Sequence, residues 1–367
     1  MNSLSVWEKI FFLKICDNQT LCQMASLSKA WRDLCYHSPH TQRIFETRSR
    51  QRISEEILSL KPDEMTWRDF YIRVYRVLHA PIETYKYCET GCLLEIRVLT
   101  NMNPPVFPSA EDVDRTIYSN HLNIFYYLVS LNPPILPTQN GVNSAAIEGF
   151  IEVVRYLTSL TPPILPSTYG VDAAANNGHM EVIQYLASLT PPILPTETGA
   201  SYAAIQNHMN ILQYIISLGI RPETSAADWS AYYGNFEIIK YLVSIDILPT
   251  HHGANMAAEN GYLDILQYLV SLNILPDDHG IVRVVEYEQF HILKYLVSIG
   301  INLPSDIADA TTHHEDLKII EYLVSLDYRP TSHGITTAVE NGYTVILNYL
   351  ATLNPPILPT LDTKDEV

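Results

Sequence analysis

The stretch Asn260–Pro276, which reads NGYLDILQYLVSLNILP, recurs in related form nine or ten times along the chain of 367 residues. Its apolar residues follow two stripes with helical spacing. These stripes are Leu263, Leu266 and Val270 on one side, and Ile265, Leu269 and Leu272 on the other. A single polar stripe of Asp264, Gln267 and Ser271 remains. The stretch therefore predicts a helix that packs between neighbours and has one edge in water.

The copies have a regular spacing, which an alignment on the Tyr-Leu pair shows. The aligned positions are Val98, Tyr127, Tyr156, Tyr185, Tyr214, Tyr241, Tyr268, Tyr295, Tyr322 and Tyr349. The step between them is constant up to Tyr214, and it is then shorter by two and again constant up to Tyr349. The two extra residues fall in the connector, where LNPPILP or LTPPILP replaces shorter forms such as LNILP. Insertions that fall between copies and leave their interiors intact indicate true repeat boundaries.

A shorter helix is predicted before each long one. In GANMAAENG, which starts at Gly253, an Ala-Ala pair allows a neighbouring helix to approach closely, and the pair recurs in three other copies. We expect this helix to end at Gly261, because a left-handed backbone residue is easiest without a Cβ atom. Most copies hold Gly at that position, and two hold Asn120 or Asn207. The predicted fold is an all-α solenoid of about ten stacked helix pairs.

Two sequence patterns in these repeats are similar to known ones. NGYLDILQYL and NGHMEVIQYL resemble the second helix of ankyrin repeats, commonly GHLEVVKLLL, and AAENGY resembles the ankyrin LAAxxGH. The resemblance covers residues 83–360, although these repeats are shorter than the ankyrin standard of about 33 residues. The ankyrin TPLH turn is absent, so a full β-hairpin is not expected. Short, tyrosine-rich arrays of this kind resemble those of giant DNA viruses of amoebae, which implies a host–virus interaction.

Charge and hydropathy limit the expected partners and compartment. The formal net charge is −17, and Met1–Ala80 holds 12 Lys and Arg against 9 Asp and Glu, which leaves 11 against 31 for the rest. An acidic surface repels phosphate, so nucleic acid and membrane are not expected as partners. The chain shows neither an apolar run of about 20 residues nor a signal peptide. These features predict a soluble cytoplasmic protein, in the host cytoplasm if the chain is viral.

The first eighty residues do not share the repeat. The segment LSVWEKIFFLKICDNQTLCQMASLSKAWRDLCYHSPHTQRIF resembles an F-box, although Ser5 and Ser28 replace its usual proline and cysteine. The resemblance implies that this segment binds the Skp-type adaptor of a cullin-RING ubiquitin ligase. The implied adaptor-binding residues are Leu4, Ile10, Leu13, Leu21, Leu27 and Trp31. The alternative is an unrelated helical cap on the solenoid. The following TWRDFYIRVYRVL, from Thr66, predicts a bridging helix.

Recognisable catalytic motifs are missing from the sequence. It contains no Gly-rich phosphate loop, HExxH motif or nucleophile elbow, so neither enzymatic activity nor a cofactor is expected. The five cysteines lack metal-site spacing and are expected to be buried, reduced thiols. The adjacent pairs His251-His252 and His313-His314 diverge on a helix, so a metal site there would need ligands from a neighbouring repeat. The PPILP connectors are expected to be structural rather than ligands of polyproline-binding domains.

A comparison of the copies with one another predicts where a target binds. Framework positions barely change, and the position of Ser271 is Ser in seven other copies. The two residues after the Ala-Ala pair vary instead. In ankyrin repeats the matching positions end the first helix on the concave face and contact ligands; ordinary exposed helix ends are the alternative. The predicted target-binding residues are Ile147, Glu148, Asn176, Asn177, Ile205, Gln206, Tyr232, Tyr233, Glu259, Asn260, Glu286, Tyr287, His313 and His314.

Four segments follow from these patterns. They are an F-box-like domain at residues 1–48, bridging helices at 49–82, the ankyrin-like array at 83–360 and an acidic tail at 361–367. The predicted function is a non-enzymatic substrate receptor of an SCF-type ubiquitin ligase, which recruits a target protein through the array. The alternative is a stand-alone binding or masking protein with no role in a ligase.

Overall fold

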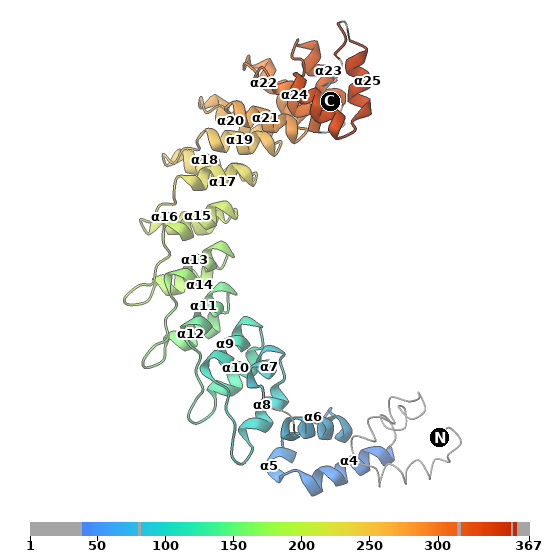
Figure 1. Cartoon of the computed structure of the whole chain (residues 1–367). Coiled ribbons are helices and arrows are strands. Elements are labelled where there is room, and N and C mark those ends of the chain that lie inside the picture. The colour runs from blue at the N-terminus through green and yellow to red at the C-terminus, as the bar shows by residue number, and fades with distance from the viewer. Residues whose placement is uncertain (1–38, 80–81, 314–316, 354, 358–367) are drawn as a thin grey trace, which may run out of the picture. The chain divides into compact units, whose positions relative to one another are not determined.

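The computed structural model describes residues 39–79, 82–313, 317–353 and 355–357, which form helices and contain no strand. The chain divides into two compact bodies, Met1–Ser167 and Thr168–Val367, and the division falls inside the predicted repeat array. Ten helix pairs follow one another along the described residues (Figure 1). The predicted all-α solenoid is therefore confirmed.

Within the described residues of the N-terminal body, three helices precede the repeats: α4 (Pro39–Arg52), α5 (Glu55–Leu58) and α6 (Trp67–His79). The predicted bridging helix is α6, and it buries Phe70, Tyr71 and Val74 at helical spacing. Its Arg73 forms an ion pair with Glu95 of the first repeat. Helix α4 runs through residue 48, where the sequence predicted a boundary.

Three repeats complete the N-terminal body. Their helices are α7 (Thr84–Glu89), α8 (Leu93–Thr100), α9 (Ala110–Tyr118), α10 (Leu122–Val129), α11 (Gln139–Ile147) and α12 (Ile151–Thr158). Each odd-numbered helix is the first helix of its repeat, and each even-numbered helix is the second.

Seven repeats form the C-terminal body. Their helices are α13 (Thr168–Asn176), α14 (Met180–Ala187), α15 (Glu197–Ile205), α16 (Met209–Ser217), α17 (Ser225–Tyr232), α18 (Phe236–Ser244), α19 (His251–Glu259), α20 (Leu263–Ser271), α21 (Asp278–Glu286), α22 (Phe290–Ser298), η1 (Ile307–His313), α23 (Leu317–Ser325), α24 (Ser332–Glu340) and α25 (Thr344–Ala351). The first helix of the ninth repeat, η1, is a 3₁₀ helix instead of the predicted α-helix.

Residue size sets the spacing of the two helix layers. Successive first helices pack closely because the Ala-Ala pairs, such as Ala203 and Ala204, are fully buried between them. Successive second helices lie further apart, and rings fill the space between them. Phe236 and Tyr268 of neighbouring second helices, for example, meet edge to face with ring centroids 5.5 Å apart. The repeated tyrosine is therefore a packing residue.

The turn between the two helices of a repeat has the predicted left-handed residue. Gly261 has a φ of 77°, and Asn120 and Asn207 have φ values of 58° and 61°. The repeat that contains α21 uses Glu288 at φ 57°, which the sequence did not predict. The serine that recurs in most second helices is also structural, because Ser271 Oγ donates a 2.6 Å hydrogen bond to the Tyr268 carbonyl oxygen.

In seven of the described first helices, a polar residue near the middle holds the start of the next first helix. Thr250 donates to the carboxylate of Asp228 through its backbone N–H, at 2.7 Å, and through its hydroxyl, at 2.8 Å. Thr250 then caps α19, because its hydroxyl oxygen accepts from the N–H of His252 at 3.1 Å. Equivalent pairs are Asp114–Thr138, Asn143–Ser167, Asp172–Thr196, Ser201–Glu223, Asn255–Asp277 and Asp309–Thr331. We call these the cap bonds.

A glycine makes room for the cap bond. A Cβ atom on Gly253 would lie 2.5 Å from Asp228 Oδ1 and 3.0 Å from Pro249 Cβ, which is closer than van der Waals contact allows. Gly253 is buried within α19 rather than at its start. The start of α19 is therefore formed by a Thr, two variable residues and a Gly that contacts the preceding repeat.

Candidate partner-binding surface

Some predicted site residues lie outside the described residues. The six predicted adaptor-binding residues fall in residues 1–38, and His314 falls in residues 314–316. His313 ends η1, but its side chain is not described. The F-box-like segment and this histidine pair remain predictions.

The other predicted target-binding residues lie where the sequence placed them, at the ends of first helices. None of the twelve is fully buried. The structure brings neighbours together repeat by repeat, since α15 packs on α17, α17 on α19 and α19 on α21. Ile147 and Glu148 belong to α11 of the N-terminal body and are not part of this group.

A third position, missed in the sequence, completes the surface. The residues immediately before the Ala-Ala pair, or before the two residues that replace it, are Tyr202, Trp229, Met256 and Arg283. They follow one another at the constant step of the shorter repeats. They precede the two predicted positions by three and four residues, which places all three on one face of each helix. We define the helix-end surface as these three positions on α15, α17, α19 and α21. The constant step between these four residues was the sequence signal that could have revealed this third position.

The half of this surface on α15 and α17 is aromatic. Trp229 is 43% exposed, Tyr202 is 41% exposed and Tyr233 is 52% exposed. Tyr232 links the rings of α17, because its centroid lies 5.7 Å from that of Trp229 and 5.0 Å from that of Tyr233, both edge to face. Large aromatic groups exposed side by side are a common feature of binding surfaces.

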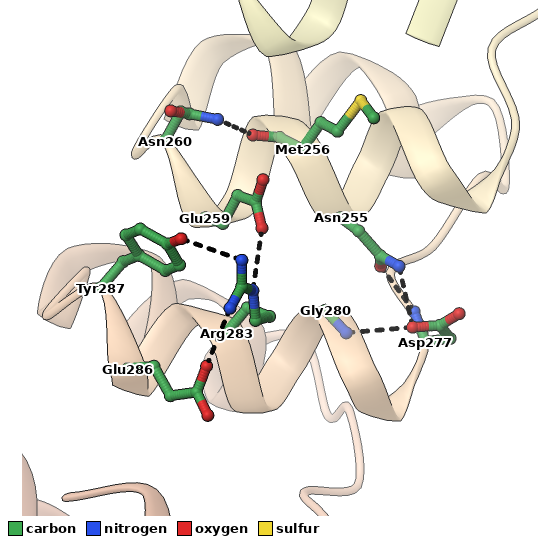
Figure 2. A network of polar contacts seen from close by, with 9 residues as sticks. All are labelled: Asn255, Met256, Glu259, Asn260, Asp277, Gly280, Arg283, Glu286 and Tyr287. Carbon is green, nitrogen blue, oxygen red and sulfur yellow. Dashed lines mark hydrogen bonds and ion pairs between the residues drawn. The ribbon is translucent and has the colours of Figure 1, made fainter. Parts of the chain in front are cut away.

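The half on α19 and α21 is a charged network (Figure 2). Arg283 Nε donates to Glu259 of the neighbouring helix at 3.4 Å, and Arg283 Nη1 donates to Glu286 at 3.3 Å. Arg283 also donates to the Tyr287 hydroxyl at 2.9 Å, and its guanidinium lies 4.7 Å from the centroid of that ring. The two carboxylates and the tyrosine are therefore held in place by one cation.

The charges of this network favour a positive ligand. Desolvation lowers the pKa of Arg283, but the nearby Tyr287, Glu259 and Glu286 more than offset it and raise the pKa above its ordinary value. One guanidinium faces two carboxylates, so a net negative charge remains. Glu259 and Glu286 are the last residues of α19 and α21, where the partial negative charge of the helix terminus adds to their own.

The exposed edge of the second helices has a different character. In α18, Glu237 forms an ion pair with Lys240 one turn away, so the two charges cancel locally. In α20, the exposed stripe is the Asp264, Gln267 and Ser271 set that the sequence predicted to face water. In α18 and α20 this edge does not present exposed rings side by side, as α15 and α17 do. The helix-end surface is therefore the stronger candidate for binding a partner.

Two cysteines and one histidine that the sequence singled out can be placed within the described residues. Cys88 and Cys92 are free, and burial raises the pKa of the Cys88 thiol to about 12. His251 Nε2 lies 3.7 Å from Asp277 Oδ2 of the next repeat. Among the described residues, however, no three His, Cys, Asp or Glu side chains are grouped so that they could hold a metal ion.

Comparisons with known proteins give the fold context. No family model matches the chain, and no curated protein matches it. Among solved structures, it is similar to the crystal structure of the pentatricopeptide repeat protein PPR10 in complex with an 18-nt psaJ RNA element. That match has a TM-score of 0.45 and 10% identity, and covers 94% of this chain and 58% of the other.

One prediction about partners is corrected. The net charge led to the exclusion of nucleic acid, and that exclusion is withdrawn, because the solved structure reported above is a complex with RNA. The physical reason is that net charge sums over a whole surface, whereas a ligand meets one part of it. As for membranes, none of the helices in the described ranges has both the length and the hydropathy to cross a bilayer.

Proposed function

We propose that the chain is a non-enzymatic, ankyrin-like protein-binding scaffold whose helix-end surface contacts a partner protein. The observation that carries this proposal is the set of exposed rings on α15 and α17 beside the ordered charges of α19 and α21. Packing does not require these side chains to be aromatic, since the equivalent positions of α13 hold Ala173, Asn176 and Asn177. Aromatic side chains give large contact area at small entropic cost and dominate interface hot spots.

The resemblance to ankyrin repeats supports the same surface, because their matching positions contact ligands. We extend the proposal to the compartment and place the protein in the cytoplasm. The repeats then act as a rigid support, since buried alanines and cap bonds fix α15, α17 and α19 to their neighbours.

Affinity purification with mass spectrometry tests this function. The bait is the full chain, and the test variant carries Tyr202→Ala, Trp229→Ala, Tyr233→Ala and Tyr287→Ala. A matched control carries Tyr126→Ala and Tyr169→Ala, which remove exposed rings from α10 and from the N-terminal end of α13. We expect the test variant to lose a partner that the wild type and the control retain. If all three retain the same partners, the helix-end surface is not the binding surface.

A second candidate function adds a ubiquitin ligase to this scaffold. It rests on the F-box resemblance of residues 1–48, through which a Skp-type adaptor would be bound while the repeats hold the target. The alternative is a stand-alone binding or masking protein. For a substrate receptor, we expect the adaptor to co-purify with the wild-type chain. We expect Trp31→Ala to lose the adaptor while its helical content stays unchanged. Absence of adaptor from the wild-type purification supports the stand-alone protein.

A further inference from the structure

Basic residues are scarce in the body that carries the helix-end surface, so most of the net negative charge of the chain lies there. Thr168–Val367 contains 23 Asp and Glu but only 7 Lys and Arg, a formal net charge of −16 out of the −17 of the whole chain. Its lysines within the described residues, Lys240, Lys294 and Lys318, all lie on second helices. The described first helices there contain a single Arg or Lys, Arg283, which is already paired. A cation that approaches the helix-end surface therefore meets little repulsion.

The equivalent positions of the N-terminal body provide an internal comparison. The position of Trp229 is occupied by Lys86 in α7 and by Arg115 in α9. Both cations lie 5.7 Å from the centroid of the same ring, Tyr85. The two bodies share an architecture, but at this position α7 and α9 present cations, whereas α15, α17 and α19 present the uncharged Tyr202, Trp229 and Met256. The character of the helix-end surface therefore comes from its own side chains and is not shared by every repeat.

The surface offers two kinds of contact to a cation. Trp229, Tyr202 and Tyr233 present exposed rings, and the faces of such rings attract guanidinium and ammonium groups. Arg283 already lies over the Tyr287 ring, which shows that a guanidinium fits against an aromatic side chain of this surface. Beside the rings, Glu286 is paired with a cation that it shares with Glu259, so it can accept from a second one.

The spacing of the helices selects an extended ligand. Packed helix axes are about 8–10 Å apart, so equivalent side chains on α15, α17, α19 and α21 repeat at about that distance. A polyproline II chain advances about 9 Å in three residues and returns to the same face at every third residue. One ligand residue in three would then meet each successive helix.

We propose that the helix-end surface binds a basic peptide segment in polyproline II conformation, with Arg or Lys at every third position. The inference rests on the proposed function and names the chemical class of its partner. The basic side chains stack on the rings of α15 and α17 and pair with the carboxylates of α19 and α21.

The test measures fluorescence anisotropy of the full chain with a labelled peptide of four Arg-Pro-Ser triplets. One control peptide has Glu in place of Arg, and another has the same composition with its four Arg residues adjacent. Trp229→Ala and Glu286→Gln probe the two halves of the surface. Glu237→Gln is the matched charge control, since it also removes one carboxylate near a cation but lies on the second helix α18. Melting temperatures confirm that each variant folds.

We expect the Arg-Pro-Ser peptide to bind the wild type, and Trp229→Ala and Glu286→Gln each to weaken it about fivefold. Glu237→Gln should change binding less than about twofold, and both control peptides should bind weakly. No binding by the Arg-Pro-Ser peptide, equal binding of the Glu peptide or of the clustered Arg peptide, or no loss in Trp229→Ala would overturn the proposal. So would tighter binding of an 18-nucleotide RNA to the same surface.

The two proposals can fail separately. If the four-residue alanine variant loses a cellular partner but the basic peptide does not bind, the surface binds a partner of another chemistry. If the alanine variant keeps every partner of the wild type, the proposed function fails, whatever the peptide does.

Discussion

At the scale of the residue, the fold depends on a polar pair that repeats along the chain. Asp228 is 8% exposed, yet its carboxylate is fully used because Thr250 donates to both of its oxygens. The same pairing occurs 24 residues apart in the longer repeats and 22 apart in the shorter ones. Because the span of the pairing lengthens by the same two residues as the repeat, the extra residues lie between the two paired residues, in the connector loop.

Replacement of Asp228 should be costly because it leaves the part-buried Thr250 N–H without its acceptor. We expect Asp228→Ala to lower the free energy of unfolding by about 2 kcal/mol, since the Thr250 N–H loses its partner. Asp228→Asn is the matched control, because Asn143 and Asn255 fill the equivalent place in other repeats and accept from the next cap. Chemical denaturation measures both. Equal losses in the two variants would contradict the role of the cap bond.

Asp277 makes one cap bond dependent on pH. Burial opposes ionisation, but the Gly280 N–H, the Asn255 side chain and the charges of His251 and His279 together lower the pKa of Asp277 below its ordinary value. A carboxyl group with a lowered folded pKa stabilises the fold above its unfolded pKa, near 3.8, and this contribution is lost as the pH falls through the folded value.

The wild type should therefore lose stability relative to Asp277→Asn between about pH 4 and pH 2, since an amide keeps an acceptor for the Gly280 N–H but does not titrate. Thermal unfolding of both proteins across this range is the measurement. Parallel curves would show that the charge of Asp277 does not contribute.

At the scale of the element, the sequence predicted most of the fold because local signals decide it. Apolar stripes located the second helices, and Gly261 and its equivalents located the turns. The cap bonds were missed, although a Thr, Ser or Asp at a fixed distance after an Asp or Asn was a visible pattern. The helix-end surface was predicted in part. The variation after the Ala-Ala pair was recognised, but the position of Tyr202 and Trp229 before that pair was not. The 3₁₀ form of η1 followed from no local signal.

The stability of a variant that lacks one repeat should depend on the cap bond that forms across the new junction. Deletion of residues 223–249 places Ser201 opposite Thr250, and the serine hydroxyl can accept from the new N–H as it does from Glu223 at 2.9 Å. Deletion of residues 250–276 places Asp228 opposite Asp277, and two carboxylates repel. Both deletions remove one whole repeat, so they are matched in length.

We expect the first deletion variant to unfold at a higher temperature than the second at pH 7, and the gap to narrow as the pH falls towards 3. Circular dichroism at both pH values measures this. The same melting temperature for both variants would show that repeats are held together by apolar packing alone.

At the scale of the whole molecule, charge is divided unevenly between two bodies of one architecture. The C-terminal body carries almost all of the net negative charge, and its first helices hold the exposed rings and carboxylates. A repeat array can vary its surface in this way because each helix end is free of packing constraints, while the alanines and cap bonds beneath it stay the same.

Binding of the Arg-Pro-Ser peptide should respond to salt. A rise from about 0.05 M to 0.5 M salt shortens the screening length several-fold, so the association rate should fall while the dissociation rate changes little. Stopped-flow anisotropy separates the two rates. A salt-independent association rate would show that the acidic body does not attract its ligand.

Photocrosslinking tests the central claim most directly, namely that a partner protein contacts the ends of the first helices. p-Benzoylphenylalanine is placed at Tyr233 in one full-length chain and at Gln267, on the exposed edge of α20, in another. After irradiation with the partner retrieved by affinity purification, we predict a crosslinked product from position 233 and none from position 267. Crosslinking from position 267 alone would place the partner on the second helices and contradict the account.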